Sequence, residues 1–438
     1  SSASDYPVVE MSEGLAKAAQ AYSQVYEFHD GYAKVRGGDF YGMIDKDGNL
    51  VVPCDYASLT TFGKILLATK SLHSRSWGVI DTQGNVVVPL KFGKDDIVVF
   101  PKEELVRVKK SEVEYDFFDF QGKDLFPQGL FARRGFKNGS VVFSEGLAAA
   151  ILDKSDLYQN PYGFVDKTGK VVIQAQFKNP ARFDNGMAWV DNTFLINTNG
   201  KVLMEVKTDG SLKGLVKSDG TEVIPCQFKD FEVYENGLLV TIGGNNLYGL
   251  WNILEGKEII SPIYDEIDYE VTDYSSWGGS LEFDGGWYAC RRFIKHGLIE
   301  VKKNNRYGLI DVAGKEILPC DYERSYYIKV GENSILTTID ITPVKSIHTL
   351  YTLDGTQIMS ERESVMGLMS EGLVAVMKND GSYSYGYYDE NGDEVIAPKY
   401  EEAGMFSEGI APVQLKATKQ WGYVNHAGKD TFGEHKET

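Results

Sequence analysis

The fold of this chain is decided by the stretch YGMIDKDGNLVVP at positions 41–53. It has the pattern of a β-hairpin, in which a short apolar strand, a polar turn and a β-branched strand follow one another. The carboxylate of Asp45 can accept backbone N–H groups of the turn, and Gly48 supplies the positive φ of a bulged hairpin loop. Pro53 is expected to end the second strand at a sheet edge.

The same hairpin recurs along the chain. Its copies are WGVIDTQGNVVVP from Trp77, YGFVDKTGKVVIQ from Tyr162, YGLIDVAGKEILP from Tyr307, YGYYDENGDEVIAP from Tyr385 and WGYVNHAGK from Trp421. In the better-preserved copies another strand precedes the hairpin, as in EGLVAVM at 371–377. The predicted unit is therefore a three-stranded antiparallel meander. A fixed period of this length indicates a solenoid, a propeller or a linear array.

The repeat also predicts the domain organisation of the 438 residues. We expect an N-terminal cap at 1–25, which is either helical or a decayed repeat fragment, an array at 26–432 and a tail at 433–438. A subdivision is expected near 200–215, because the spacing from Gly200 to Gly220 is too short for a whole unit. An insertion is expected at 268–293, because the spacing from Gly256 to Gly314 is too long.

We predict an all-β fold in which about ten such units form an open, curved superhelical array. The chain starts on a strand of the third type and ends on a hairpin, so no split blade is evident to close a ring. Ten blades would also exceed the usual propeller count. The alternative is one propeller-like ring, or two.

The combined pattern of [WY]G, a turn Asp, a turn Gly, VIP and [FM]SEG resembles the WG repeat family (WG-containing or KWG repeats), found mostly in bacteria. The resemblance extends over residues 26–432. It implies an all-β repeat scaffold with interaction roles. Because the family carries no defined catalytic residues, the resemblance assigns no active site to this chain.

The net charge and the hydropathy of the chain limit the classes of partner that it can bind. A net charge of −18 argues against nucleic acid and anionic membranes, since both repel an acidic surface. The simplest role of this charge is solubility. No apolar run is long enough to cross a bilayer, so we expect no integral membrane segment.

The start SSASDYPVV lacks a signal-peptide pattern and an initiator Met, which indicates a processed or trimmed start. Localisation stays open, with export to the periplasm or cell surface, with or without a lipid anchor, favoured over the cytoplasm.

The residues that could carry chemistry do not form recognisable sites. Cys54, Cys226 and Cys320 follow the repeat proline at equivalent positions, and Cys290 lies in the insertion, so all four are interpreted as structural thiols. The Asp45 turn resembles the start of a calcium loop but lacks the downstream bidentate Glu. No histidine pair, nucleophile elbow or phosphate loop appears. We therefore expect no enzyme, no cofactor and no metal.

The insertion is the segment that the repeat does not explain. It combines acidic residues with aromatic ones, of which Tyr274, Trp277, Trp287 and Tyr288 are the candidate contact residues. Such side chains can stack on sugar rings or anchor a protein partner. The structural alternative is an extended hairpin that packs its own aromatic side chains on the array.

The leading hypothesis for function is a non-enzymatic repeat scaffold that binds another protein, as a subunit of a bacterial envelope complex. The second hypothesis is a surface carbohydrate-binding protein that uses the aromatic residues at 268–293. A hydrolase with its site on the concave face of the array is a third.

Overall fold

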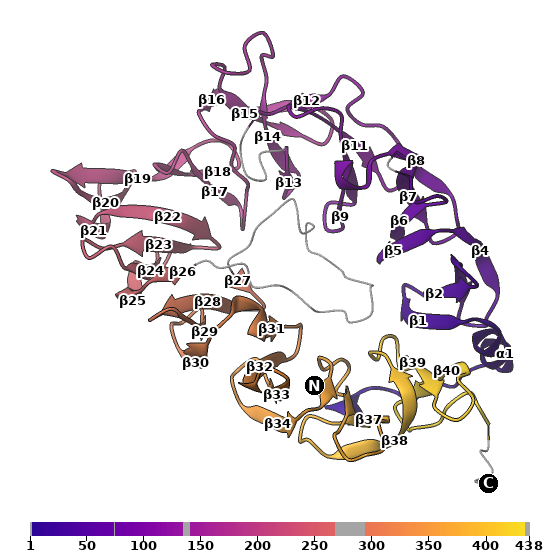
Figure 1. Cartoon of the computed structure of the whole chain (residues 1–438). Helices are drawn as coiled ribbons and strands as arrows, with labels where there is room; N and C mark the ends of the chain where they lie inside the picture. The colour runs from indigo at the N-terminus through magenta and orange to yellow at the C-terminus, as the bar shows by residue number, and fades with distance from the viewer. Residues whose placement is uncertain (1, 74, 135–140, 268–293, 434–438) are drawn as a thin grey trace. The chain divides into compact units, whose positions relative to one another are not determined.

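The computed structural model describes residues 2–73, 75–134, 141–267 and 294–433. Contacts divide these residues into two compact units. Unit 1 holds residues 2–94 and 326–433, and unit 2 holds residues 95–267 and 294–325. The described strands form nine antiparallel sheets, labelled in Figure 1. No described helix is long and apolar enough to cross a membrane.

Unit 1 contains four of these sheets, and in each the strands pair in sequence order. Its elements are the single 3₁₀ turn Ala3–Asp5, α1 (Glu13–Ala21), β1 (Gln24–His29), β2 (Tyr32–Gly37), β3 (Phe40–Asp45), β4 (Leu50–Tyr56), β5 (Ser58–Phe62), β6 (Ile65–Thr69), β7 (Trp77–Asp81), β8 (Val86–Phe92), β31 (Ile328–Val330), β32 (Ile335–Thr342), β33 (Lys345–Tyr351), β34 (Gln357–Arg362), β35 (Val365–Met366), β36 (Val374–Met377), β37 (Tyr385–Tyr388), β38 (Glu394–Ala403), β39 (Ile410–Leu415) and β40 (Trp421–Asn425). The last six strands form one sheet.

Unit 2 contains the other five sheets. Its strands are β9 (Ile97–Phe100), β10 (Leu105–Lys109), β11 (Glu114–Asp119), β12 (Leu130–Phe131), β13 (Phe143–Ser144), β14 (Leu147–Ile151), β15 (Tyr162–Asp166), β16 (Val171–Phe177), β17 (Met187–Val190), β18 (Phe194–Asn197), β19 (Val202–Asp209), β20 (Leu212–Lys217), β21 (Glu222–Phe228), β22 (Asp230–Glu235), β23 (Leu238–Ile242), β24 (Tyr248–Asn252), β25 (Lys257–Tyr264), β26 (Glu266–Ile267), β27 (Ile294–Lys295), β28 (Leu298–Lys303), β29 (Arg306–Asp311) and β30 (Glu316–Tyr322). Further 3₁₀ turns lie at Lys94–Asp96 and Ser325–Tyr327.

The repeating unit has four strands rather than the three predicted. In the first sheet, β1 precedes the predicted meander β2–β3–β4 and pairs with β2. The two strands are joined by Asp30 and Gly31, whose φ angles are 54° and 83°. Two successive positive φ values form a type I′ turn, which suits the twist of a hairpin. The same turn occurs at Glu408 and Gly409. Where a repeat carries an acidic-Gly pair at this place, the pair is thus a hairpin turn, and a further strand comes before it.

The WG glycine permits a bulge in the hairpin. Tyr41 pairs with Tyr56 and Met43 pairs with Val52, so β4 carries extra residues opposite Gly42. A Cβ atom on Gly42 would lie 2.3 Å from the carbonyl oxygen of Val52. Only a residue without a side chain allows this approach. The strand runs through the repeat proline and continues to Tyr56, so the prediction that proline ends this strand is wrong.

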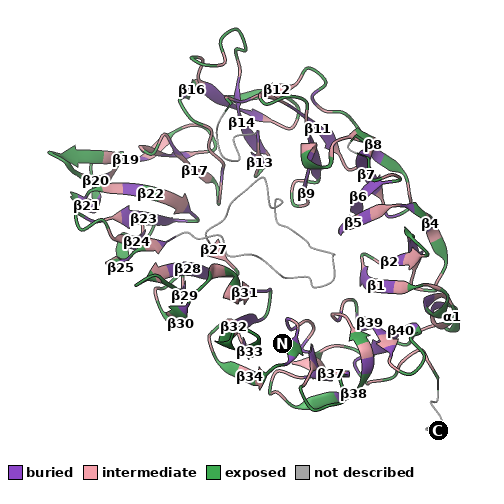
Figure 2. Ribbon diagram, in the orientation of Figure 1, coloured by how far each residue is buried: buried purple, intermediate pink, exposed green. Residues whose placement is uncertain are grey.

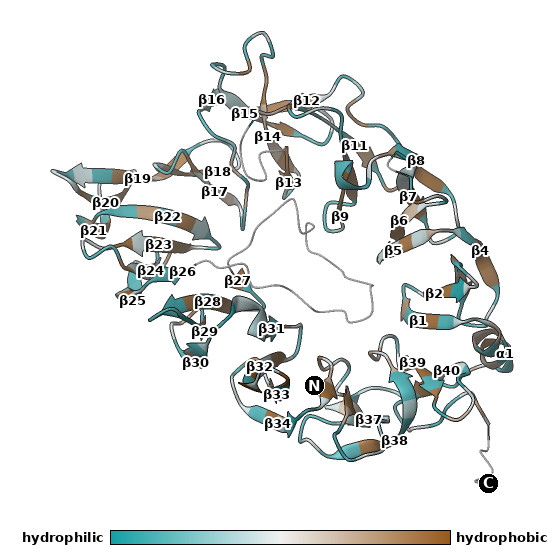
Figure 3. Ribbon diagram, in the orientation of Figure 1, coloured by the Kyte–Doolittle hydropathy of each residue, from teal (hydrophilic) through white to brown (hydrophobic). Residues whose placement is uncertain are grey.

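Burial differs between the inner and the outer strands of a sheet (Figure 2). All five residues of β6 are buried, whereas only Val52 and Tyr56 of the seven residues of β4 are buried. Figure 3 shows hydrophilic and hydrophobic stretches along β38, which pairs with both β37 and β39. In unit 2 the core includes the rings of Phe117 and Phe143, whose centroids lie 4.9 Å apart in an edge arrangement.

The sheets at the two ends of the chain pack against each other within unit 1 (Figure 1). β1 contacts β39 and β40, and α1 contacts β40. One core cluster contains Leu15 of α1, Phe28 of β1 and Tyr423 of β40. The Tyr423 hydroxyl donates a hydrogen bond to the backbone oxygen of Tyr26 at 2.7 Å. The sheets are therefore blades of an all-β propeller, and the prediction of an open superhelical array is wrong.

Two features explain this error. In two sheets, strands of consecutive units pair with one another: β38 pairs with both β37 and β39, and β19 pairs with both β18 and β20. The number of described sheets is therefore smaller than the number of turn glycines. In addition, the ends are joined by side-chain packing and hydrogen bonds rather than by a strand of one end pairing into the sheet of the other. The two ends of the chain therefore meet without a sheet that contains strands from both ends.

Candidate functional site: the seam between the chain ends

The Ser-Glu-Gly turn of one repeat forms hydrogen bonds with the corresponding turn of the next repeat. In unit 2, the Ser144 hydroxyl donates to the carbonyl oxygen of Phe183 at 2.6 Å. The next residue, Glu145, accepts a hydrogen bond from the Gly186 N–H at 2.9 Å. We call this pair of contacts the turn staple. It satisfies backbone groups that would otherwise lack partners at the junction of two repeats.

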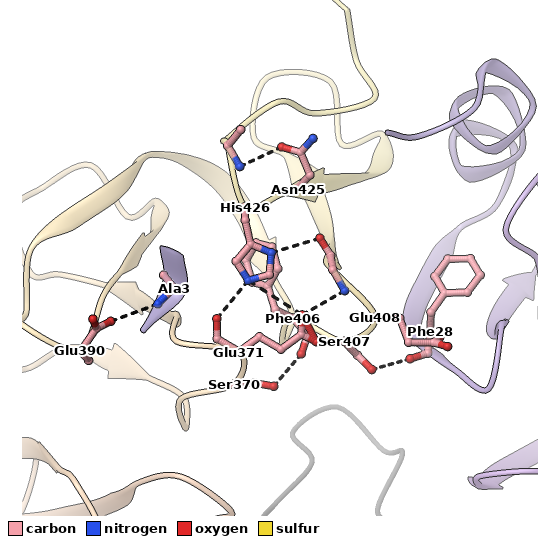
Figure 4. A network of polar contacts seen from close by, with 12 residues as sticks. Ala3, Phe28, Ser370, Glu371, Glu390, Phe406, Ser407, Glu408, Asn425 and His426 are labelled. Carbon is pink, nitrogen blue, oxygen red and sulfur yellow. Dashed lines mark hydrogen bonds and ion pairs between the residues drawn. The ribbon is translucent and has the colours of Figure 1, made fainter. Parts of the chain in front are cut away.

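The turn staple also joins the last repeat to the first (Figure 4). The Ser407 hydroxyl donates to the carbonyl oxygen of Phe28 at 2.5 Å. The Glu408 carboxylate accepts from the Gly31 N–H at 2.9 Å. These contacts have the same partners and the same geometry as those inside the chain. We call the junction of β1 with β38, β39 and β40 the seam.

A cation one residue after the turn aspartate reinforces the staple. Lys46 donates to the backbone oxygen of Glu408 at 3.3 Å, and its ammonium lies 3.9 Å from the carboxylate of the same residue. In unit 2, Lys167 contacts Glu103 in the same way, at 2.8 Å to the backbone oxygen and 3.0 Å to the carboxylate. In each case a single ammonium group thus contacts both the backbone oxygen and the carboxylate of a glutamate in the turn of the preceding repeat.

His426 occupies the place of these lysines in the last hairpin (Figure 4). Its Nε2 lies 3.0 Å from the backbone oxygen of Glu371, and its Nδ1 lies 3.3 Å from the backbone oxygen of Gly409. Because both neighbours are carbonyl acceptors, both hydrogen bonds form only when the ring carries two N–H groups. The ring also stacks on Tyr6, with centroids 5.3 Å apart. The ring nitrogens of this buried histidine therefore lie beside one backbone oxygen of the preceding repeat and one of its own repeat.

A pocket of about 110 Å³ opens at the seam. Its walls include Tyr26 and Glu27 of β1, Glu402 of β38, Pro412 of β39 and Trp421 of β40. Glu402 is exposed, whereas Trp421 is 7% exposed and Glu27 is 5% exposed. The pocket therefore has one carboxyl group deep inside and a second that is open to solvent.

Glu27 is the unusual group of this pocket. Its Oε1 accepts a hydrogen bond from the Met405 N–H at 3.2 Å. A Cβ atom on Gly404 would lie 2.8 Å from this oxygen, so the glycine makes room for the carboxyl group. Burial raises the pKa of Glu27 to about 7, although backbone hydrogen bonds and the charge of Lys34 act to lower it.

The contact residues predicted from the sequence, Tyr274, Trp277, Trp287 and Tyr288, lie outside the described residues. Their role stays a prediction. Sequence reasoning missed the seam altogether. One signal was present, since the second strand of the last repeat has proline at position 412 where the first repeat has lysine at position 34.

The part of the chain that the structure describes offers neither a metal site nor a reactive thiol. No three His, Cys, Asp or Glu side chains are grouped there in a way that could hold a metal ion. Cys54, Cys226 and Cys320 are free thiols. Burial raises the pKa of the Cys320 thiol to about 11, which disfavours the reactive thiolate.

Comparison with protein-family models places the repeats in a known family. The model described as WG containing repeat matches residues 41–64, 77–112, 162–192, 214–241 and 385–417. The chain belongs to the WG containing repeat family. These five matches include the hairpins from Tyr41, Trp77, Tyr162 and Tyr385. No curated protein matches this WG repeat chain.

Three solved structures show remote similarity to this WG repeat protein. A eukaryotic initiation factor is 12% identical, with 77% of this chain and 86% of that chain covered and a TM-score of 0.38. BamB from Moraxella catarrhalis is 9% identical, with 99% and 98% covered and a TM-score of 0.25. KlHsv2 with loop 6CD replaced by a Gly-Ser linker is 10% identical, with 78% and 97% covered and a TM-score of 0.27. Similarity at this level carries no information on function.

Proposed function

We propose that this WG repeat propeller is a non-enzymatic scaffold that binds another protein through the hairpin of β32 and β33. The observation that carries the proposal is a set of aliphatic side chains exposed on that hairpin. Ile339 and Ile341 are each 47% exposed, and Val344 is 89% exposed. In β6, the strand of another unit 1 sheet that corresponds to β32, all residues are buried. Exposed apolar side chains grouped on one element are typical of protein contact sites.

The hairpin extends beyond its own sheet. Pairing between β32 and β33 continues to Thr342 and Lys345. The outer strand β34 ends earlier, with Arg362 opposite Ile347. The last turn of the hairpin therefore presents both of its faces to solvent, and Val344 lies at its tip.

Polar contacts brace the base of this hairpin. The Tyr327 hydroxyl donates to the carboxylate of Asp340. His348 has Thr338 at 3.2 Å from its Nδ1 and Ser346 at 3.3 Å from its Nε2. A braced hairpin loses little conformational freedom on binding, which favours affinity. The partner that fits is a protein with an apolar groove that can receive the aliphatic side chains.

Binding is favoured over catalysis because the polar groups at the seam already serve the fold. The turn staples and His426 are engaged with backbone groups of neighbouring repeats. We therefore propose that the array positions a contact surface and carries out no reaction. A turnover screen on purified protein addresses this part of the proposal, and any substrate conversion would refute it.

The binding proposal is tested by site-specific crosslinking in cells. A photo-crosslinking amino acid is placed at position 344, with position 395 as the matched control, since Val395 is also an exposed aliphatic residue of unit 1 (42%). We expect one protein to crosslink at 344 and not at 395. The identity of this protein then decides whether the complex belongs to the bacterial envelope.

The affinity of the purified partner is then measured. The triple variant Ile339→Ser, Ile341→Ser, Val344→Ser is expected to raise its Kd at least about tenfold, because each buried aliphatic group contributes about 1–2 kcal/mol. The control Val395→Ser is expected to leave the Kd unchanged. Equal affinities for the triple variant and the control would refute the role of the hairpin.

A further inference from the structure

At two junctions between repeats, one in each unit, a long cationic side chain of the second strand reaches the next repeat, and the seam has no such side chain. In unit 1, Lys34 of β2 donates from its ammonium to the backbone oxygen of Leu59 in the next repeat, at 3.1 Å. In unit 2, Arg107 of β10 donates in the same direction to the backbone oxygen of Val141, at 3.1 Å. The corresponding residue of the last repeat is Pro412 in β39, which has no group that can reach the first repeat.

The strand register shows that these positions are equivalent. Lys34 pairs with Met43, the residue that follows the glycine of the first WG pair. Pro412 pairs with Tyr423, which follows the glycine of the last WG pair. At the seam the short, rigid ring of Pro412 therefore occupies the position at which the first repeat has the long cationic side chain of Lys34.

The space left beside Pro412 is the seam pocket. Its volume is about 110 Å³, slightly smaller than an apolar cavity of about 150 Å³ that can hold benzene. A chain of about four carbon atoms would fill it. The pocket differs from an apolar cavity because the carboxyl group of Glu27 lines it.

Within the described residues, no cation lies within ion-pair distance of Glu27. Lys34, on the adjacent strand, is directed to Leu59 instead, and its ammonium lies 4.2 Å from the ring centroid of Tyr26. The charge of Lys34 therefore acts on Glu27 only from a distance. A buried carboxylate with no cation in contact is costly, and a cation that touches it would reduce that cost. Trp421 and Tyr26 add aromatic rings to the walls, and such rings favour a bound cation.

We propose that the seam pocket binds a primary alkylammonium group, supplied by a small aliphatic amine or by the lysine side chain of a peptide. The ammonium group donates hydrogen bonds to Glu27 in the interior and to Glu402 at the mouth. The alkyl chain lies between Pro412 and the ring of Trp421. The bound ligand thus supplies the cation that a lysine of the chain supplies in the first repeat. This binding site is independent of the β32–β33 hairpin.

Calorimetry with two probes and one neutral analogue tests the proposal on the whole chain at pH 8. The probes are n-butylammonium chloride and a short peptide with one central lysine, and the analogue is n-butanol. We expect an ammonium probe to bind and n-butanol not to bind. Binding of n-butylammonium alone assigns a small amine, and binding of the peptide assigns a lysine side chain. No binding by either probe, or equal binding of n-butanol, overturns the proposal.

Three variants locate the binding. Glu27→Gln keeps an oxygen for the Met405 N–H but removes the charge, and it is expected to weaken binding at least tenfold. Pro412→Lys is expected to abolish binding, because the new side chain would extend toward the first repeat, as Lys34 extends toward the second, and would fill the pocket. Glu300→Gln removes a buried carboxyl in unit 2 and is the matched control, which should bind as the natural chain does. Unchanged binding by both Glu27→Gln and Pro412→Lys would refute the proposed site.

Discussion

Replacing Glu300 by glutamine is expected to change how the stability of unit 2 depends on pH. This residue of β28 is 1% exposed. Its Oε2 accepts a hydrogen bond from the Ser325 hydroxyl at 3.1 Å, and its Oε1 is buried without a hydrogen-bond partner in the described residues. The ionised form is thus poorly solvated. Burial raises the pKa of Glu300 from 4.5 to about 8, although the bond from Ser325 acts to lower it.

The sign and size of the effect follow from these two pKa values. Between pH 4.5 and about 8, folded Glu300 retains a proton that the unfolded chain has released. The free energy of unfolding therefore falls as pH rises through this window. The stabilising contribution is complete below pH 4.5 and is lost above pH 8. A difference of this size corresponds to at most about 5 kcal/mol, at about 1.4 kcal/mol for each pH unit.

The assay is urea denaturation of the natural chain and of Glu300→Gln at pH 5 and pH 9, followed by tryptophan fluorescence. Glutamine is close in shape to the protonated acid, so we expect unfolding free energies within about 1 kcal/mol of each other at pH 5. At pH 9 we expect the glutamine variant to be more stable by several kcal/mol. Glu316→Gln, an exposed residue of the same sheet, is the control and should follow the natural chain. The reasoning is refuted if Glu300→Gln and the natural chain change equally between the two pH values.

Two further substitutions test the packing of the repeats. Ser407→Ala removes the hydroxyl that donates to Phe28 across the seam, so we expect a loss of about 1 kcal/mol and faster hydrogen exchange in β1; unchanged protection of β1 would contradict this role. Gly386→Ala places a Cβ atom 2.7 Å from the backbone oxygen of Ile396, so we expect a loss of about 2 kcal/mol or more. Gly244→Ala, with no atom within 4 Å of the added carbon, should change stability by less than about 1 kcal/mol, and equal melting temperatures for the two glycine variants would argue against the close approach.

The hairpin turn could be predicted because its interactions are local. Asp45 accepts hydrogen bonds from the N–H groups of Asp47 and Asn49, each at 2.9 Å. Gly48 has a φ of 82°. All partners lie within four residues of the aspartate, so the requirements for the turn are visible in the residue types themselves. The calcium-loop interpretation of this turn was rejected on the same local evidence.

The four-stranded unit was only partly predictable. The acidic-Gly pair was recognised as part of the repeat, but its role as a type I′ turn depends on a positive φ at Glu408 or Asp30, residues without special freedom. The strand before this turn has a weak signal, because β1 carries a bulge between Val25 and Phe28 that interrupts its alternation. The predicted unit therefore had three strands and did not include this one.

The amino-acid sequence alone determined the repeat, its turns, its all-β class and its family, since each of these depends on residues close together in the chain. Tertiary structure alone decided that the two ends of the chain meet within unit 1. Ser407 and Phe28 are 379 residues apart. The Ser-Glu-Gly turn also joins consecutive repeats, so its amino-acid sequence does not reveal which repeat a given turn will contact. The seam pocket depends on the same closure, because Glu27 and Pro412 face each other only after the two ends have come together.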